Sequence, residues 1–420
     1  MAKALKKSSY GKDMVSGGGP GALSSGAPPP FPPKRGPALG DPLRILVLNY
    51  EYPPLGGGGG SFAAALCGQL AKMGHSIRVV TGYYRGLPRV EIRDGVTIYR
   101  PRSWRRHQHT CGVGEMGLFL LTGLFPALRQ TLTWRPHLLQ AHFAVPTGVL
   151  SWVIHRLTGV PYVLSAQLGD VPGGVPDQTD HLFTWLKPFT VPIWQAAAQV
   201  TVPSCHIQAL AQSSYPGVSL EVVHNGIDLT GQGLSPLAAH QPVRLIFAGR
   251  FSPQKNLLCL IKALQQVKDL GWRLELVGDG PEMPLIREQV NLAGLAPRVD
   301  FHGWVAPAKV AAIMSQGDIL VLPSLAEGLP LVGVQALVAG LAILGSDIGG
   351  VAEVVRSGLN GFLCPANDSG GFAGALRVML TTDGLLPKMK AASRSLAEAF
   401  AIPNIAVQFE GIFQRVVGRT

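Results

Sequence analysis

Arg250, Lys255 and Glu327 are the residues of this sequence best suited to act on a charged ligand. Arg250 and Lys255 come directly after the apolar run 244–249, and Glu327 precedes the apolar run 331–339. Open α/β sheets bind ligands beyond the carboxyl ends of their strands, so two cations at a strand end predict an anion site. Backbone N–H groups at a helix start bind phosphate oxygens, while Arg and Lys neutralise the remaining charge. The pattern predicts a site for a diphosphate next to a sugar.

Two parts of the chain share a pattern of strand, glycine-containing turn, helix and strand. The first part has strands at 44–50 and 76–81, with a helix at 61–73 between them. The second part starts 200 residues later; its expected elements are strands at 244–249, 273–278, 299–303, 319–323 and 342–346, and a helix at 257–270. Alternating strands and helices predict parallel sheets with helices on both faces. We therefore expect two doubly wound α/β domains in succession.

Several short motifs lie at the expected strand ends of the second part. They are Phe247-Ala-Gly-Arg-x4-Lys-Asn256, Gly278-Asp-Gly-Pro281, His302-Gly-Trp-Val305 and Glu327-Gly-Leu-Pro330, with His224-Asn-Gly-Ile-Asp228 before them. As a set they resemble the family 4 retaining glycosyltransferases. The resemblance covers roughly residues 43–415, and it implies the B-type fold, in which two Rossmann-like domains face each other across a cleft.

The resemblance also implies a domain plan. Residues 1–41 are rich in Lys, Gly, Pro and Ser, and such a segment cannot bury enough apolar surface to fold, so we predict a disordered tail. Residues 42–232 would form the acceptor domain and residues 233–399 the nucleotide-sugar donor domain. Residues 400–420 would form a closing helix that returns to the first domain.

In the second domain, the resemblance gives roles to named residues. Arg250 and Lys255 would grip the diphosphate, and Glu327 would contact the donor sugar on its reacting face. Gln335 stands where the family has a second glutamate, which holds the ribose; an amide is a weaker acceptor there. Further donor-binding candidates are Asn225, Gly278, Val305, Gly328, Leu329 and Pro330. Alternative interpretations are a plain helix-start carboxylate for Glu327 and a tight turn for Asn225.

In the first domain, Gly57 and Gly58 belong to a run of five glycines that can approach a phosphate or a sugar closely. His142 and Asp170 are further catalytic candidates by resemblance, although His142 lies beside an apolar run and could equally be structural. Gln167, on the acceptor side, stands where the family has a histidine near the reaction centre. No Gly-x-Gly-x-x-Gly fingerprint with a following acid is evident, which argues against a dehydrogenase.

The net charge of +11 is confined to the first half of the chain. Residues 1–200 contain 20 Lys and Arg against 9 Asp and Glu, whereas residues 201–420 contain 16 of each. This asymmetry predicts an anionic partner for the first half. Arg102, Trp104, Arg105 and Arg106 precede the apolar run 116–128, a pattern typical of an interfacial membrane anchor, or else of a buried helix beside a solvated loop. We expect an anionic membrane surface rather than nucleic acid, because no nucleic-acid motif is present.

The remaining features place limits on location and cofactors. The five cysteines form no Cys-x-x-Cys pair, which favours a reducing compartment and small buried side chains. Because we find neither an apolar signal segment nor an apolar run of ~18 residues, we expect a cytoplasmic protein, with peripheral binding at the inner face of the membrane as an option. Apart from the nucleotide-sugar co-substrate we expect no cofactor, and no metal.

Two hypotheses about function follow. The first is a retaining hexosyltransferase-type enzyme that moves a sugar from a nucleotide-sugar to a sugar, lipid-linked or other acceptor. In the front-face mechanism, the departing phosphate oxygen takes the acceptor's proton. The alternative is a catalytically weakened member that binds sugar nucleotides or acts as a scaffold, motivated by Gln167 and Gln335.

Overall fold

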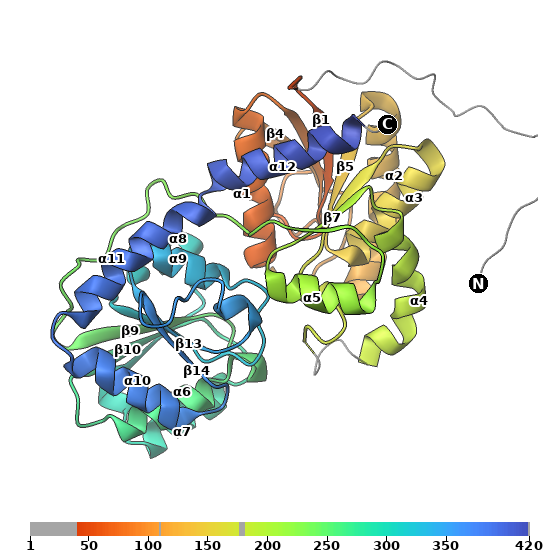
Figure 1. The fold of residues 1–420 in the computed structure, drawn as a ribbon. Helices are drawn as coiled ribbons and strands as arrows, with labels where there is room; N and C mark the ends of the chain where they lie inside the picture. The colour runs from red at the N-terminus through yellow and green to blue at the C-terminus, as the bar shows by residue number, and fades with distance from the viewer. Residues whose placement is uncertain (1–39, 109–110, 176–180, 419–420) are drawn as a thin grey trace, which may run out of the picture. The chain divides into compact units, whose positions relative to one another are not determined.

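The computed structural model describes residues 40–108, 111–175 and 181–418. Nearly all of the predicted tail at 1–41 lies outside these ranges. The described chain contains two large sheets, each flanked by helices (Figure 1). The prediction of two doubly wound α/β domains is therefore confirmed.

The first sheet has eight strands in the order β3-β4-β2-β1-β5-β6-β7-β8. The pairs are parallel except for β3 with β4. Its strands are β1 Arg44–Leu48, β2 Ser76–Val80, β3 Val90–Arg93, β4 Val96–Tyr99, β5 Leu138–His142, β6 Tyr162–Ser165, β7 Gln199–Val202 and β8 Leu220–Val222. Its helices are α1 Gly58–Lys72, α2 Val113–Trp134, α3 Val149–Thr158, α4 His181–Gln195 and α5 Cys205–Ser214.

The second sheet has six parallel strands in the order β11-β10-β9-β12-β13-β14. Its strands are β9 Val243–Ala248, β10 Trp272–Val277, β11 Val299–Gly303, β12 Ile319–Leu322, β13 Ala342–Ser346 and β14 Gly361–Cys364. The helices of this part are α6 Leu257–Gln266, α7 Met283–Leu292, α8 Pro307–Met314, α9 Leu331–Ala339, α10 Ser369–Thr381 and α11 Leu385–Ala397. In both sheets the order changes direction around a central strand, β1 or β9, and ligands of such folds bind at the carboxyl ends near that point.

Each sheet is buried on both faces, which explains why its central strands are continuous apolar runs. In the first sheet, one face packs against α1 and the last helix, α12 Ile402–Val417, through side chains such as Phe62, Phe409 and Phe413. Figure 1 shows α1 and α12 side by side over this sheet. The other face packs against α2, α3, α4 and α5. In the second sheet, α6, α7 and α10 cover one face, and α8 and α9 cover the other.

Three helices differ in length from the sequence-based expectation. Helix α6 ends at Gln266 instead of residue 270. Helix α1 starts at Gly58 instead of Ser61, so three glycines lie in its first turn and Gly57 is its N-cap. Glycine is a poor helix former, and the sequence pattern placed this segment in a turn. Helix α2 extends well beyond 116–128 at both ends and contains Pro126.

Helix α2 has an outward stripe of apolar residues. Leu121 and Phe125 are 79% and 73% exposed, and Leu132 lies further along the same side. In the loop before the helix, Trp104 is 72% exposed and Arg102 and Arg106 are exposed. Arg105, the remaining member of the predicted basic patch, is buried and not exposed like the other three. Its guanidinium donates to the carbonyl of Tyr50 (3.1 Å) and lies 3.9 Å from the Glu51 carboxylate.

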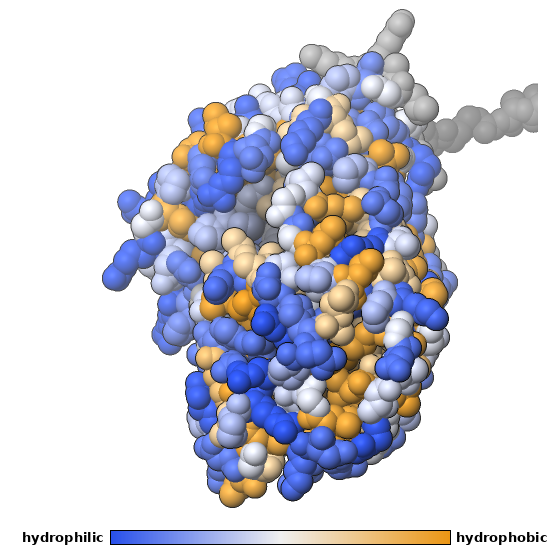
Figure 2. Space-filling view, turned by 90° about the vertical axis from the view of Figure 1, so that its left-hand side faces the viewer, coloured by the Kyte–Doolittle hydropathy of each residue, from blue (hydrophilic) through white to orange (hydrophobic). Residues whose placement is uncertain are grey.

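No helix of the described chain is long and apolar enough to cross a bilayer. Figure 2 shows one face of the molecule, on which hydrophobic residues form separate patches among hydrophilic ones.

Candidate functional site

Lys255 and Glu327 form a close ion pair at the carboxyl edge of the second sheet. The Lys255 Nζ lies 2.5 Å from the Glu327 Oε1, and the Ser324 hydroxyl donates to the same oxygen at 2.8 Å. Lys255 lies in the turn between β9 and α6, and Glu327 in the loop between β12 and α9. Because β9 and β12 are hydrogen-bonded neighbours, residues 72 positions apart meet at one edge.

Two further hydrogen bonds join the loops that hold this pair. The backbone N–H of Leu325 donates to the carbonyl of Gln254 (2.8 Å), and the Gln254 side-chain amide donates to the carbonyl of Ala326 (2.7 Å). Glu327 is itself only 7% exposed. A buried carboxylate needs an ion pair or hydrogen bonds in place of water, and Lys255 and Ser324 supply both to Glu327.

Arg250 is exposed at the end of β9, on the same edge. Its loop is fixed by the loop after β10, because the N–H of Phe251 donates to the carbonyl of Asp279 at 2.9 Å. Gly278 permits this approach. Its φ is +129°, and a Cβ there would lie only 1.9 Å from the Gly249 carbonyl oxygen. Only glycine fits such a position. The N–H of Gly278 also donates to the carbonyl of Gly303 (2.9 Å), the last residue of β11, and the half-buried Val305 follows two residues later.

Gly328, Leu329 and Pro330 lie immediately before α9, with Pro330 as its N-cap. Gly328 and Leu329 are buried, and their backbone N–H groups donate to no other residue in the described part of the chain. Buried amide donors are nearly always satisfied in folded proteins, so these two are available to a ligand's oxygens.

Gln335 lies one turn into α9, four residues after Leu331, and is therefore on the same side of the helix. Leu331 points toward the first sheet's part of the chain, where a Cβ on Gly58 would lie 2.8 Å from its Cδ1. Gln335 is half-buried and forms no side-chain hydrogen bond to another described residue. The Gln335 amide therefore has its hydrogen-bonding capacity unused among the described residues.

Asp170 is buried, and it joins two loops of the first sheet. Its carboxylate accepts hydrogen bonds from the N–H groups of Ala144 and Gln167, each at 2.8 Å. Burial raises the pKa of Asp170 to about 7, while the backbone donors act in the opposite direction. The structure thus gives Asp170 a part in holding the loops after β5 and β6.

His142 is also buried, beside the ring of Phe62, with its centroid 6.1 Å away. Burial lowers the pKa of His142 to about 3, so the imidazole is neutral. Neither ring nitrogen has a hydrogen-bond partner in the described structure. In this conformation His142 cannot touch a ligand, and it acts as a core residue, which was the alternative interpretation of the sequence.

Gln167 and Asn225 are in contact. The Asn225 side-chain amide donates to the Gln167 Oε1 at 3.0 Å, and Asn225 is buried. Gln167 is therefore hydrogen-bonded to the segment that precedes the second sheet. Next to it, Leu168 packs close to Gly328, with 3.1 Å between the Leu168 Cβ and a Cβ built on that glycine.

Glu51, which lies 3.9 Å from the guanidinium of Arg105, was missed in the sequence. Glu51 follows β1, and its Oε2 accepts a hydrogen bond from the N–H of Gly57 at 3.3 Å. A Cβ on Gly56 or Gly60 would collide with Glu51, so the glycine run folds closely around this residue. Burial raises the pKa of Glu51, while Arg105 and Arg250 lower it. A carboxylate followed by glycines was the only signal that could have indicated it.

Within the described residues, no group of three or more His, Cys, Asp or Glu side chains is placed to hold a metal ion. Arg250 and Lys255 are cationic side chains at the second sheet's edge.

Both parts of the chain match known families. Residues 57–226 match the glycosyl transferase 4-like domain, and residues 242–382 match the glycosyl transferases group 1. The chain is a glycosyltransferase with the two-domain B-type fold. The glycosyltransferase is 25% identical to a glycogen synthase of Mycobacterium tuberculosis over 392 residues, which cover 84% of this chain and 89% of the relative. It is 27% identical to the alpha-maltose-1-phosphate synthase of Mycolicibacterium smegmatis over 416 residues, covering 89% of this chain and all of that relative.

Solved structures show the same fold at lower identity. The sucrose-phosphate synthase of Thermosynechococcus elongatus superimposes with a TM-score of 0.78 at 19% identity, covering 90% of this glycosyltransferase and 100% of that chain. Anabaena Alr3699/HepE, solved in complex with UDP-glucose, gives a TM-score of 0.68 at 19% identity and covers 88% and 99%.

Proposed function

We propose that this glycosyltransferase belongs to the retaining family 4 and transfers a sugar from a nucleotide-sugar to an acceptor hydroxyl. The observation that carries this proposal is the site at the edge of the second sheet. There, Arg250, the ion pair of Lys255 with Glu327 and the backbone amides before α9 all lie at the carboxyl ends of strands of one sheet. Cations and N–H groups together bind a diphosphate, and a carboxylate beside them binds sugar hydroxyls.

The site also supports the front-face mechanism. The bond between the anomeric carbon and the diphosphate oxygen breaks as the acceptor oxygen attacks from the same face. The acceptor's proton moves to the departing phosphate oxygen, and Arg250 and Lys255 stabilise the charge that develops there. Such preorganised donors are worth about 3 kcal/mol each in a transition state. A strong protein base is not needed, which agrees with the burial of His142 and the pairing of Glu327.

A ligand screen followed by a turnover assay tests this proposal. A nucleoside diphosphate that binds the folded protein at ~100 times its dissociation constant should add ~2.7 kcal/mol of stability, visible as a rise in Tm. The probes are UDP, ADP and GDP, together with nucleotide-sugars that contain each of these nucleoside diphosphates. If a nucleotide-sugar raises the Tm and the protein then releases a nucleoside diphosphate from it, the protein transfers the sugar and is an active enzyme. If a nucleotide-sugar raises the Tm but its sugar is transferred neither to an added acceptor nor to water, the sugar-nucleotide-binding or scaffold alternative is favoured.

For the acceptor side we propose that the outward stripe of α2 docks on an anionic membrane, where a lipid-linked acceptor would be reached. Exposed apolar side chains at Leu121 and Phe125, with an exposed Trp104 and two exposed arginines in the loop before the helix, are typical of an interfacial helix. Glu115 is the single acid in α2, and it accepts hydrogen bonds from the N–H groups of Arg106 and Gly112. Apart from Glu115, α2 contains no acidic residue that would oppose an anionic surface.

Co-sedimentation with vesicles of phosphatidylserine and phosphatidylcholine tests the docking surface. Binding should fall as salt rises, because each basic residue near the bilayer contributes ~1 kcal/mol that salt screens. Leu121→Ser with Phe125→Ser, and Arg102→Glu with Arg106→Glu, should each remove most of the binding. Leu292→Ser, at a site that is 72% exposed on α7, is the matched control. Arg105 is left unchanged because it is buried. Equal binding by all these variants would refute the surface.

A further inference from the structure

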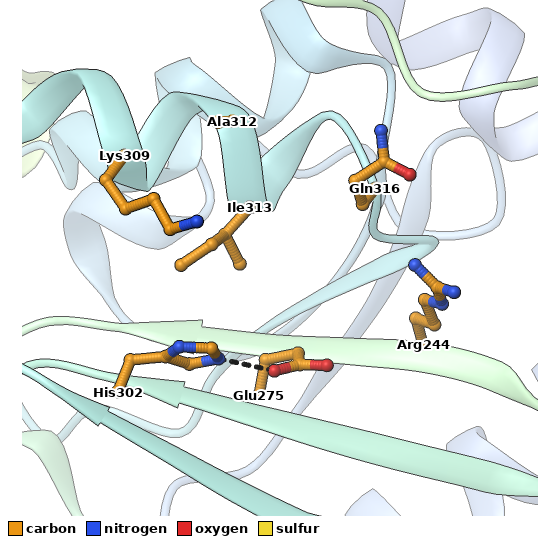
Figure 3. Close-up of a pocket in the computed structure, with 7 residues that line it drawn as sticks. All are labelled: Arg244, Glu275, His302, Lys309, Ala312, Ile313 and Gln316. Atoms are coloured by element: carbon orange, nitrogen blue, oxygen red, sulfur yellow. Dashed lines mark hydrogen bonds and ion pairs between the residues drawn. The ribbon is translucent and has the colours of Figure 1, made fainter.

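A cavity of about 180 Å³ lies in the second part of the chain, between α8 and the sheet. Arg244 of β9, Glu275 of β10 and His302 of β11 form its floor, and Lys309 and Ile313 of α8 lie above them (Figure 3). Sites for drug-sized ligands measure ~300–1,000 Å³, so this cavity suits a smaller molecule.

The sequence pattern explains why the cavity exists. Along β9 and β10, every second residue faces α8 and α9, and near the centre of the sheet these residues are apolar, such as Ile246 and Val277. Toward the edge strand β11, the same face carries charged residues instead. Near β11 the sheet therefore presents charged side chains to α8 instead of apolar ones. Helix α8 does not cover these side chains completely, and the uncovered space is the cavity.

The charges on this face are not balanced. The Glu275 carboxylate is hydrogen-bonded to the His302 Nε2 at 2.5 Å, and Asp300 is paired with Arg273 at 3.6 Å. Both acids on these two strands are thus satisfied. The side chains of Arg244 and Lys309 form no ion pair or hydrogen bond with another described residue. Two cations therefore face the cavity without an acid of their own.

The two cations lie at opposite ends of the cavity. Figure 3 shows Lys309 above His302 at one end, and Arg244 with the Gln316 amide at the other; the Glu275 carboxylate lies between. A ligand that matches this pattern has an anionic group at each end, one for each cation. A hydroxyl between them could donate to the free oxygen of Glu275.

We propose that this cavity is a regulatory site for a small molecule with an anionic group at each end, such as a phosphorylated hydroxy acid. Lys309 and Arg244 would each hold one anionic end. His302 belongs to the segment that continues through Gly303, whose carbonyl accepts the N–H of Gly278. A ligand that contacts His302 therefore acts on the loops beside the donor site; this regulatory part rests on the proposed function, whereas binding in the cavity does not.

Isothermal titration calorimetry on the full chain tests the binding, with 3-phosphoglycerate as the probe. A saturating concentration of nucleoside diphosphate is kept present, so that the phosphate groups of the probes do not bind at Arg250 and Lys255. We expect 3-phosphoglycerate to bind more tightly than glycerol 3-phosphate, which lacks the second anionic end, and than inorganic phosphate. Equal affinities for the three probes, or no binding, would overturn the proposal.

Variants at the two ends sharpen this test. Arg244→Gln and Lys309→Gln should each raise the dissociation constant of 3-phosphoglycerate by about tenfold or more, as expected for the loss of one charge-assisted hydrogen bond. One of the two should also abolish the preference over glycerol 3-phosphate, which identifies the end that holds the carboxylate. Lys262→Gln, at an exposed position on α6 across the sheet, is the matched control and should bind normally.

The regulatory part has its own readout. The dissociation constant of the nucleoside diphosphate is measured with and without saturating 3-phosphoglycerate. Linkage requires that each ligand change the other's affinity by the same factor, and the factor should return to one in Lys309→Gln. If 3-phosphoglycerate binds but leaves nucleotide affinity unchanged, the regulatory role is wrong. If no nucleoside diphosphate binds at all, the proposed function fails, while the cavity is still tested by direct titration.

Discussion

At the scale of single residues, the ion pair of Lys255 with Glu327 determines how the site can be probed. Removal of Lys255 would leave Glu327 as an unpaired, buried carboxylate, and breaking such a pair destabilises the fold. A Lys255→Ala variant therefore mixes an effect on turnover with an effect on folding. Arg250 is exposed and lies on the same edge, so its replacement separates the two effects.

Arg250→Ala should lower kcat by about 10²–10³-fold, because one preorganised donor to the leaving group is lost. The Tm should remain close to that of the unmodified protein, since an exposed side chain contributes little to stability. Steady-state kinetics and a thermal melt measure both quantities. Lys262→Ala is the control for the loss of an exposed cation elsewhere on this part of the chain. Near-normal turnover in Arg250→Ala would show that Arg250 does not stabilise the leaving diphosphate.

Gln335→Glu should maintain or modestly tighten the binding of a nucleoside diphosphate. A carboxylate is a better acceptor than an amide for two ribose hydroxyls, although its charge also repels the diphosphate. Calorimetry with UDP and ADP measures the change, and Gln289→Glu on α7 is a control for adding a carboxylate to a helix. Strong weakening of nucleotide binding in a folded Gln335→Glu protein would show that this residue does not lie at the ribose.

At the scale of elements, Glu353 connects the start of α5 with the segment that leads to the second sheet. Its carboxylate accepts a hydrogen bond from the N–H of Cys205 (2.9 Å) and is paired with the His224 Nε2 (3.1 Å). The hydrogen bond with His224 lowers the pKa of Glu353, and the N–H of Cys205 lowers it further. The ionised form is therefore stabilised in the folded protein.

Glu353→Gln should lower the Tm at pH 7. A carboxyl whose pKa is lower in the folded state stabilises fully above its ordinary pKa, and that contribution is lost as the pH falls through the folded value. The difference in Tm between Glu353→Gln and the unmodified protein should therefore shrink below about pH 4. Glu288→Gln, at an exposed position on α7, should show no such difference. A Tm difference that is independent of pH would rule out the charged pair as its cause.

At the scale of the whole molecule, the distribution of charge and acids predicts catalysis without a metal ion. The described residues contain no cluster of ligands suited to a divalent cation, and two cationic side chains already lie at the proposed diphosphate site. Once a donor has been identified, turnover in excess EDTA should equal turnover in buffer. Loss of activity in EDTA that is restored by Mg²⁺ or Mn²⁺ would contradict this prediction.

Much of this molecule could be predicted from local patterns in the sequence. Apolar runs bounded by glycine and proline predict buried parallel strands, and their alternation with helical segments predicts two doubly wound sheets. Arg250 was found in the same way, because a cation directly after a strand lies at the sheet's carboxyl edge in any such fold.

Contacts between distant segments were decided only by the tertiary structure. Lys255 meets Glu327 because β9 and β12 are neighbours, and Arg244 shares a cavity with His302 because β11 lies at the edge beyond β10. Burial is decided in the same way: the sequence shows an arginine in a basic patch and a histidine at a strand end, but Arg105 and His142 are enclosed by residues far along the chain. Strand order and burial depend on which apolar faces pack together, and no local spacing contains that information.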